Sequence, residues 1–120
     1  MSKKTLVIGA SANPMRYSNR AVRRLLENNI EVHAIGRFKT TIDGIEVQTE
    51  QNYIKDIHTI ALYINPLYQK QFYDYIVKLK PKRIIFNPGT HNDELKKLAR
   101  ENDIEVVEDC VLVMLRSNSY

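Results

Sequence analysis

The sequence predicts an α/β fold, a three-layer arrangement in which helices cover both faces of a doubly wound parallel sheet. Apolar runs of strand length alternate along the chain with helix-like patterns, and such alternation is typical of a parallel sheet. The first run, 6–8, is continuously apolar, as expected of a central strand that is buried on both faces. The 120 residues contain no internal linker, so we expect one domain that spans residues 1–120.

Six strands are expected. Five of them fall at 6–8, 31–36, 59–64, 82–86 and 104–107. The sixth is a small edge strand within 41–47, where an alternating run follows the turn signal Asp43-Gly44. With right-handed crossovers, the predicted strand order is 3-2-1-4-5-6, and the order reverses beside the first strand.

Four helices are expected between and after these strands. The first covers about 18–29, and the second begins at Pro66, where the missing N–H of proline costs little. Asn92 caps the third helix. The apolar segment 110–115 should pack back on the sheet as a short fourth helix.

The composition limits the classes of partner. The chain carries a net charge of +4, but its arginines on the first helix, such as Arg20 and Arg24, repeat at the spacing of one solvated face. No nucleic-acid-binding motif accompanies the charge, and no apolar run is long enough to span a membrane. A single cysteine fits a reducing compartment, and we expect a cytoplasmic protein.

The clearest functional signal is the turn after the first strand. Gly9 permits a sharp turn, and the small residues Ala10, Ser11 and Ala12 let backbone N–H groups approach an anion. The N-terminus of the following helix adds a favourable dipole. The predicted topology brings this loop, 10–18, beside three others at the carboxyl ends of the strands, 36–39, 65–68 and 87–92. We therefore expect a phosphate-bearing ligand at this edge.

The loop departs from the common nucleotide fingerprints. The three glycine positions of the G-x-G-x-x-G dinucleotide motif are occupied by Gly9, Ser11 and Pro14, and the acidic residue expected after the second strand is replaced nearby by Arg37. This argues against NAD and leaves NADP or another ligand with an additional ribose phosphate. No Walker-type P-loop motif occurs.

Three stretches of sequence, in their order and spacing, resemble one known family. They are Gly9-Ala10-Ser11 with Asn13-Pro14, Arg16 and Tyr17-Ser18; Ile42 to Val47 with its central Gly44; and Phe86-Asn87-Pro88-Gly89 with Glu105-Val106-Val107-Glu108-Asp109-Cys110. The chain resembles, over essentially its whole length, the small stand-alone CoA-binding proteins of Rossmann type, which are similar to the CoA-binding domain of the succinyl-CoA synthetase α subunit.

The resemblance implies a Rossmann-like fold that binds coenzyme A (CoA) or an acyl-CoA at the carboxyl ends of the strands. The loop around Ser11 would hold the pyrophosphate, and the exit of the second strand would lie beside the adenosine. Many relatives carry Asn-Pro at that exit, where this chain has Gly36-Arg37. Arg37 and Lys39 offer donors for the 3′-phosphate of CoA. The expected CoA-binding residues are Gly9, Ala10, Ser11, Ala12, Asn13, Arg16, Tyr17, Ser18, Gly36, Arg37, Lys39, Asn65, Pro66, Asn87, Pro88 and Gly89.

Signals for catalysis are weaker. His33, His58 and His91 have no metal-ligand spacing, and Ser11 lacks the G-x-S-x-G context of a hydrolase. His91 lies at the ligand edge, and Cys110 follows the last strand there. We expect a non-catalytic binding or regulatory module for CoA, with an NADP-binding oxidoreductase-like protein as the alternative. A homo-oligomer or a partner protein is compatible with either.

Overall fold

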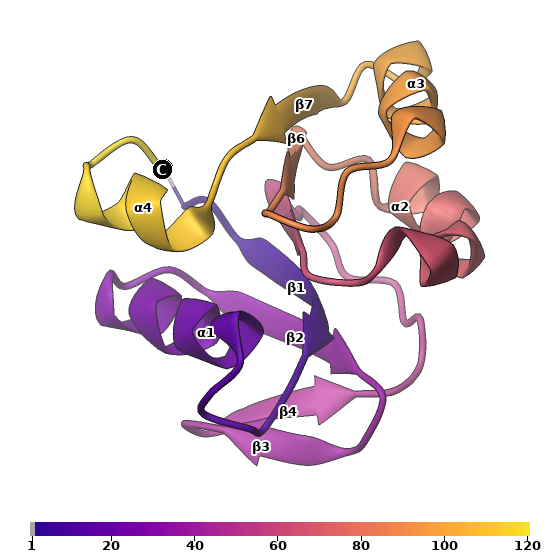
Figure 1. The fold of residues 1–120 in the computed structure, drawn as a ribbon. Coiled ribbons are helices and arrows are strands. Elements are labelled where there is room, and N and C mark those ends of the chain that lie inside the picture. The colour runs from indigo at the N-terminus through magenta and orange to yellow at the C-terminus, as the bar shows by residue number, and fades with distance from the viewer. Residues whose placement is uncertain (1) are drawn as a thin grey trace.

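In the computed structural model, which describes residues 2–120, seven strands form one sheet between two layers of helices (Figure 1). The strands are β1 (Thr5–Ala10), β2 (Val32–Gly36), β3 (Thr40–Ile42), β4 (Ile45–Gln48), β5 (Thr59–Leu62), β6 (Arg83–Phe86) and β7 (Glu105–Glu108). The helices are α1 (Tyr17–Glu27), α2 (Tyr73–Leu79), α3 (Asp93–Glu101) and α4 (Val111–Arg116), and two 3₁₀ turns, η1 (Pro66–Tyr68) and η2 (Lys70–Phe72), precede α2. The predicted α/β class is confirmed.

The predicted strand number and order are wrong at one end of the sheet. The observed order is β3-β4-β2-β1-β5-β6-β7. Six of these strands are joined by parallel pairings, with the neighbours that the sequence predicts, and β3 pairs antiparallel with β4. The sheet thus has one more strand than the predicted order 3-2-1-4-5-6, and β3 rather than β4 forms the edge.

The additional strand results from the Asp43-Gly44 turn. Asp43 has φ +47° and Gly44 has φ +85°, and two consecutive residues with positive φ form the tight turn that joins antiparallel strands. The chain therefore reverses at once, and Thr40–Ile42 pairs with Ile45–Val47. The turn was recognised in the sequence, but the three residues before it are too few to show a strand pattern.

The helices lie on the two faces of the sheet as Figure 1 shows, α1 and α4 on one face and α2 and α3 on the other. The expected cap of α3 is confirmed, because Asn92 Oδ1 accepts a hydrogen bond of 3.2 Å from Leu95 N. The short C-terminal helix is confirmed as α4. No helix within residues 2–120 is both long and apolar enough to cross a membrane.

The prediction of one helix beginning at Pro66 is wrong, since this segment forms η1 and η2 and the α-helix starts only at Tyr73. Asn65 Oδ1 accepts a hydrogen bond from Leu67 N and starts the first turn. The side chain of Gln69 is fully buried and donates to the backbone oxygens of Ile64 and Thr90. These tertiary bonds hold the segment against the loop after β6, in place of a continuous helix.

Two apolar clusters fill the space on either side of the sheet. Leu6, Ile8 and Leu62 point toward α2 and α3, and Val7 and Ala61 point toward α1 and α4. Because side chains alternate along a strand, the continuously apolar β1 contributes to both clusters. The central position predicted for this strand is confirmed.

The backbones of β1 and β2 approach closely where both strands end. A Cβ atom at Gly36 would overlap the carbonyl oxygen of Ala10 and would lie 2.9 Å from Val47 Cγ1. Ala10 and Gly36 are register partners in the β1–β2 pair. Only glycine therefore fits at this position, and it places the loops after β1 and β2 side by side.

We predict that Gly36→Ala destabilises the protein by roughly 2–4 kcal/mol, because insertion of an atom into closely packed structure forces the backbone to shift. Gly44→Ala is the matched control: open space surrounds Gly44, and only its positive φ opposes a side chain, at a cost of about 1–2 kcal/mol. Urea unfolding measures both changes. Equal stability of wild type and Gly36→Ala would contradict the close approach.

Candidate functional site

The four loops expected to bind a ligand, 10–18, 36–39, 65–68 and 87–92, lie side by side and are called here the carboxyl edge. Ala10 pairs with Gly36 across β1 and β2. On the other side of β1, Tyr63 N donates to Ile8 O at 2.8 Å. These contacts bring three of the loops together, and the fourth joins them through Asn87, as described below.

The loop between β1 and α1 is held by its own polar side chains. Gly9 turns the chain with φ +97°, and a Cβ there would lie 2.8 Å from Tyr63 O. Ser11 Oγ accepts a hydrogen bond of 3.1 Å from Asn13 N, and Asn13 Oδ1 accepts one of 2.9 Å from Met15 N. The loop is thus folded into successive side-chain turns.

The first helix begins without a cap. Arg16 occupies the N-cap position and makes no side-chain capping bond, and the first turn of α1 contains no acidic residue. The buried side chain of Asn19 instead donates 2.9 Å to the backbone oxygen of Ser11 and ties the helix to the loop. Backbone N–H groups at an uncapped helix start are available to an anion.

Cations lie on the two adjacent loops that follow β1 and β2. Arg16, Arg37 and Lys39 are exposed and form no ion pair with any residue in the described part of the chain. By contrast, Arg24, near the far end of α1, is paired with Glu27 at 3.1 Å. The guanidinium carbon of Arg37 lies 5.8 Å from the ring centre of Phe38, which leaves its donors free.

The loops after β5 and β6 are joined by buried amides. Asn87 is almost fully buried, and its side chain donates to Leu62 O at 3.0 Å and accepts from Val111 N at 2.9 Å. Gln69 also connects these two loops, because its Oε1 accepts a hydrogen bond of 2.8 Å from Asn92 Nδ2. The sequence did not single out Gln69, because a glutamine within a helix-like pattern gives no sign that it is buried.

The predicted site residues separate by exposure. The side chains of three of them, Ala10, Ser18 and Asn87, are buried. The remaining predicted residues are partly or fully exposed along the carboxyl edge. The side-chain nitrogen and oxygen of Asn87 each make a hydrogen bond within the protein, so this buried amide has a structural role.

A polar cluster that the sequence did not predict lies at the β6–β7 end of the carboxyl edge. Lys96 Nζ is buried and lies 2.5 Å from Glu108 Oε1 and 2.6 Å from His91 Nδ1. His91 Nε2 lies 3.0 Å from Asp93 Oδ1. Hydrogen bonds from Lys96 and then His91 lower the pKa of Glu108 below its ordinary value, which keeps this carboxylate charged. Lys96 was missed because its position on α3 carries no motif.

The following cysteine, tyrosine and histidine side chains do not gather into a second polar cluster. Cys110 is partly buried at the start of α4, and the buried hydroxyl of Tyr63 has no hydrogen-bond partner. Burial raises the pKa of Tyr63, so it stays neutral. His33 and His58 are hydrogen-bonded to Glu31 and Thr59. Across residues 2–120, no three His, Cys, Asp or Glu side chains are grouped to hold a metal ion.

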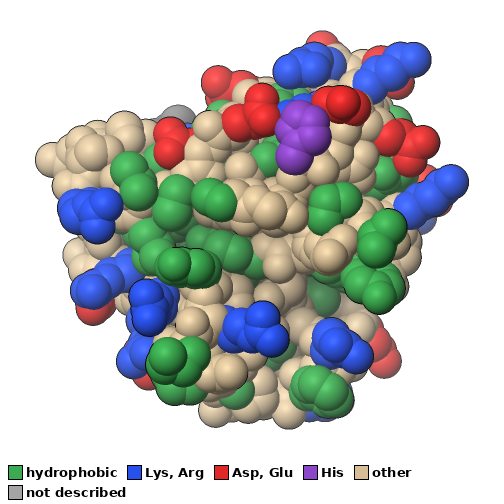
Figure 2. All heavy atoms as spheres, in the orientation of Figure 1, with side chains coloured by type: hydrophobic (Ala, Val, Ile, Leu, Met, Phe, Trp, Pro, Cys, Tyr) green, Lys and Arg blue, Asp and Glu red, His purple; other side chains and the backbone are tan. Residues whose placement is uncertain are grey.

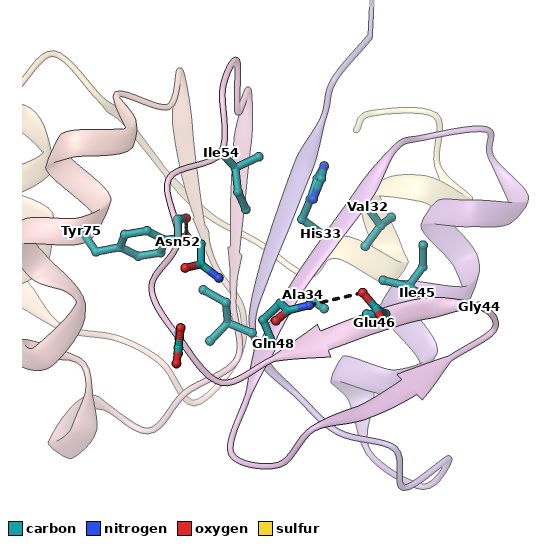
Figure 3. Close-up of a pocket in the computed structure, with 12 residues that line it drawn as sticks. Val32, His33, Ala34, Gly44, Ile45, Glu46, Gln48, Asn52, Ile54 and Tyr75 are labelled. Carbon is teal, nitrogen blue, oxygen red and sulfur yellow. Dashed lines mark hydrogen bonds between the residues drawn. The ribbon is translucent and has the colours of Figure 1, made fainter.

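One hollow of about 490 Å³ lies away from the predicted site residues. Figure 3 shows it on the open face of β2 and β4, where His33, Gln48, Asn52, Ile54 and Tyr75 surround it. Tyr75 closes one side, and its hydroxyl donates to Asn52 O at 2.6 Å.

Comparison with solved structures places this geometry among known proteins. A crystal structure of an uncharacterized protein is 43% identical, with a TM-score of 0.97, and the alignment covers 100% of this chain and 99% of that one. The structure of cell-free ID.343 from Thermus thermophilus is 22% identical, with a TM-score of 0.85, and the alignment covers 98% and 91% of the two chains.

A larger protein shares the fold. The dinucleotide-forming acetyl-coenzyme A synthetase 1 from Ca. Korarchaeum cryptofilum is 16% identical, with a TM-score of 0.72, over 90% of this chain and 26% of the synthetase. No curated protein sequence is close enough to count as a match. The family model described as "CoA binding domain" matches residues 3–116, nearly the whole chain. The Rossmann-like architecture and this match confirm the resemblance seen in the sequence: the chain belongs to the CoA-binding domain family.

Proposed function

We propose that the protein binds CoA or an acyl-CoA along its carboxyl edge, as a binding or regulatory module without catalysis of its own. The main support is the uncapped start of α1, surrounded by cations that have no partner among the described residues. An isolated group of positive charges is unfavourable in the free protein, and a phosphate ligand would relieve it.

The pyrophosphate of CoA fits the loop around Ser11. There α1 begins without a side-chain cap, and the exposed Arg16 occupies its N-cap position. Small residues at Ala10, Ser11 and Ala12 leave room for phosphate oxygens to approach the backbone. The adenosine and the pantetheine arm of CoA would then lie along the carboxyl edge, on either side of this loop.

The adenosine belongs on the β2 side of this loop. Arg37 and Lys39 follow β2 directly and have unpaired charges suited to the ribose 3′-phosphate of CoA. The pantetheine arm would run the opposite way, past Asn65 and Pro66 after β5 and toward Pro88 and Gly89 after β6.

We assign no catalytic residue. The two ring nitrogens of His91 are in contact with Lys96 and Asp93, and the side chain of Lys96 is itself buried. Neither group presents a free nucleophile or base to a bound thioester. A regulatory or carrier role is the reading that this arrangement supports.

We predict that CoA binds the wild-type protein and that Ser11→Leu weakens binding at least tenfold, because a bulky side chain blocks the approach of phosphate to the backbone. Isothermal titration measures the affinity. Ser2→Leu, an exposed change before β1, is the matched control and should bind like wild type. Wild type that binds NADPH but not CoA would overturn the proposal in favour of a dinucleotide-binding protein.

We also predict that CoA binds more tightly than dephospho-CoA, which lacks only the 3′-phosphate. Hydrogen bonds to charged groups contribute roughly 1.5–3 kcal/mol, and solvent exposure reduces this, so we expect about a tenfold difference. Arg37→Ala should remove most of this difference and leave dephospho-CoA binding unchanged. Arg24→Ala, at the far end of α1, should preserve it. Equal affinities in wild type would contradict the assignment of Arg37.

A further inference from the structure

Large apolar side chains are exposed along the carboxyl edge. Five of the seven exposed large hydrophobic residues within residues 2–120 lie on or directly beside its loops: Met15, Tyr17, Phe38, Leu67 and Tyr68. Leu67 is 82% exposed and Tyr68 is 61% exposed, both on η1. Such a concentration on one edge of a small protein marks a surface that another molecule covers.

The proposed position of CoA decides which of these residues meet its reactive end. The unpaired cations lie after β2 and β1, and the phosphates belong there. Since β5 is the next strand on the other side of β1, the arm that ends in the thiol runs toward η1. Leu67 and Tyr68 therefore border the position of an acyl group, whereas Phe38 borders the adenosine.

The charge beyond η1 is of the opposite sign. Asp93, Glu94, Glu108 and Asp109 lie on the loops and element ends that follow β6 and β7. Three lysines lie near these four carboxylates: Lys70 on η2, Lys97 on α3, and Lys96, whose ammonium is buried against Glu108 and His91. Figure 2 shows acidic side chains on both sides of a histidine near β7, and Lys and Arg side chains both over α1 with its neighbouring loops and around α3.

On these grounds we infer that the acyl group of the ligand is apolar and uncharged, a medium-length fatty acyl chain in preference to a dicarboxylic one. The inference rests on the proposed CoA site. The exposed side chains of Leu67 and Tyr68 supply apolar surface for such a chain, and the acidic end of the carboxyl edge repels a terminal carboxylate.

Isothermal titration with free CoA, acetyl-CoA, octanoyl-CoA and succinyl-CoA tests the inference. Octanoyl-CoA should bind at least tenfold more tightly than acetyl-CoA, since burial of roughly two of its six additional methylene groups is enough for this. Succinyl-CoA should bind no more tightly than acetyl-CoA. The double variant Leu67→Ser/Tyr68→Ser should abolish the preference for octanoyl-CoA, because it weakens the binding of octanoyl-CoA at least tenfold more than the binding of free CoA.

Tyr53→Ser is the matched control, because Tyr53 is an equally open aromatic residue between β4 and β5, outside the carboxyl edge. It should keep the full preference. Equal affinity for acetyl-CoA and octanoyl-CoA, or tighter binding of succinyl-CoA, would overturn the inference about the acyl group. If free CoA still binds in that case, the proposed function stands, and the apolar surface would belong to a partner protein. Absence of CoA binding by wild type would overturn both.

Discussion

Three strands meet with almost no space between their backbones where β1 ends. On one side Gly36 lies against the Ala10 carbonyl, and on the other a Cβ at Gly9 would lie 2.8 Å from Tyr63 O. Glycine at both positions lets the chain leave β1 between its neighbours. The loops after β2, β1 and β5 are consequently packed side by side at one edge.

Buried amides extend this arrangement to the rest of the edge. The side chains of Asn87 and Gln69 form hydrogen bonds with backbone groups of neighbouring loops. Replacement of a buried amide of this kind is destabilising, because its partners would lose their hydrogen bonds. Their role is to fix the loops. The residues left free to meet a ligand are the exposed ones, such as Arg37 and Leu67.

Charge divides the carboxyl edge in a way that suits an asymmetric ligand. Cations without partners stand near the α1 start and after β2, and carboxylates stand after β6 and β7, where the one buried ammonium is matched by Glu108. CoA carries its phosphates at one end and an uncharged arm at the other, so the proposed orientation puts the phosphates near the cations and keeps them away from the carboxylates.

The sequence by itself determined the α/β class and the neighbours of the parallel strands, because apolar runs act locally. It also identified Arg37 and Ser11 as candidates. Only the tertiary structure decided that Thr40–Ile42 is a strand, that Gln69 interrupts a helix, and that Lys96 is buried beside His91 and Glu108. Each of these depends on a partner distant in sequence or across a turn, and no local pattern records such partners.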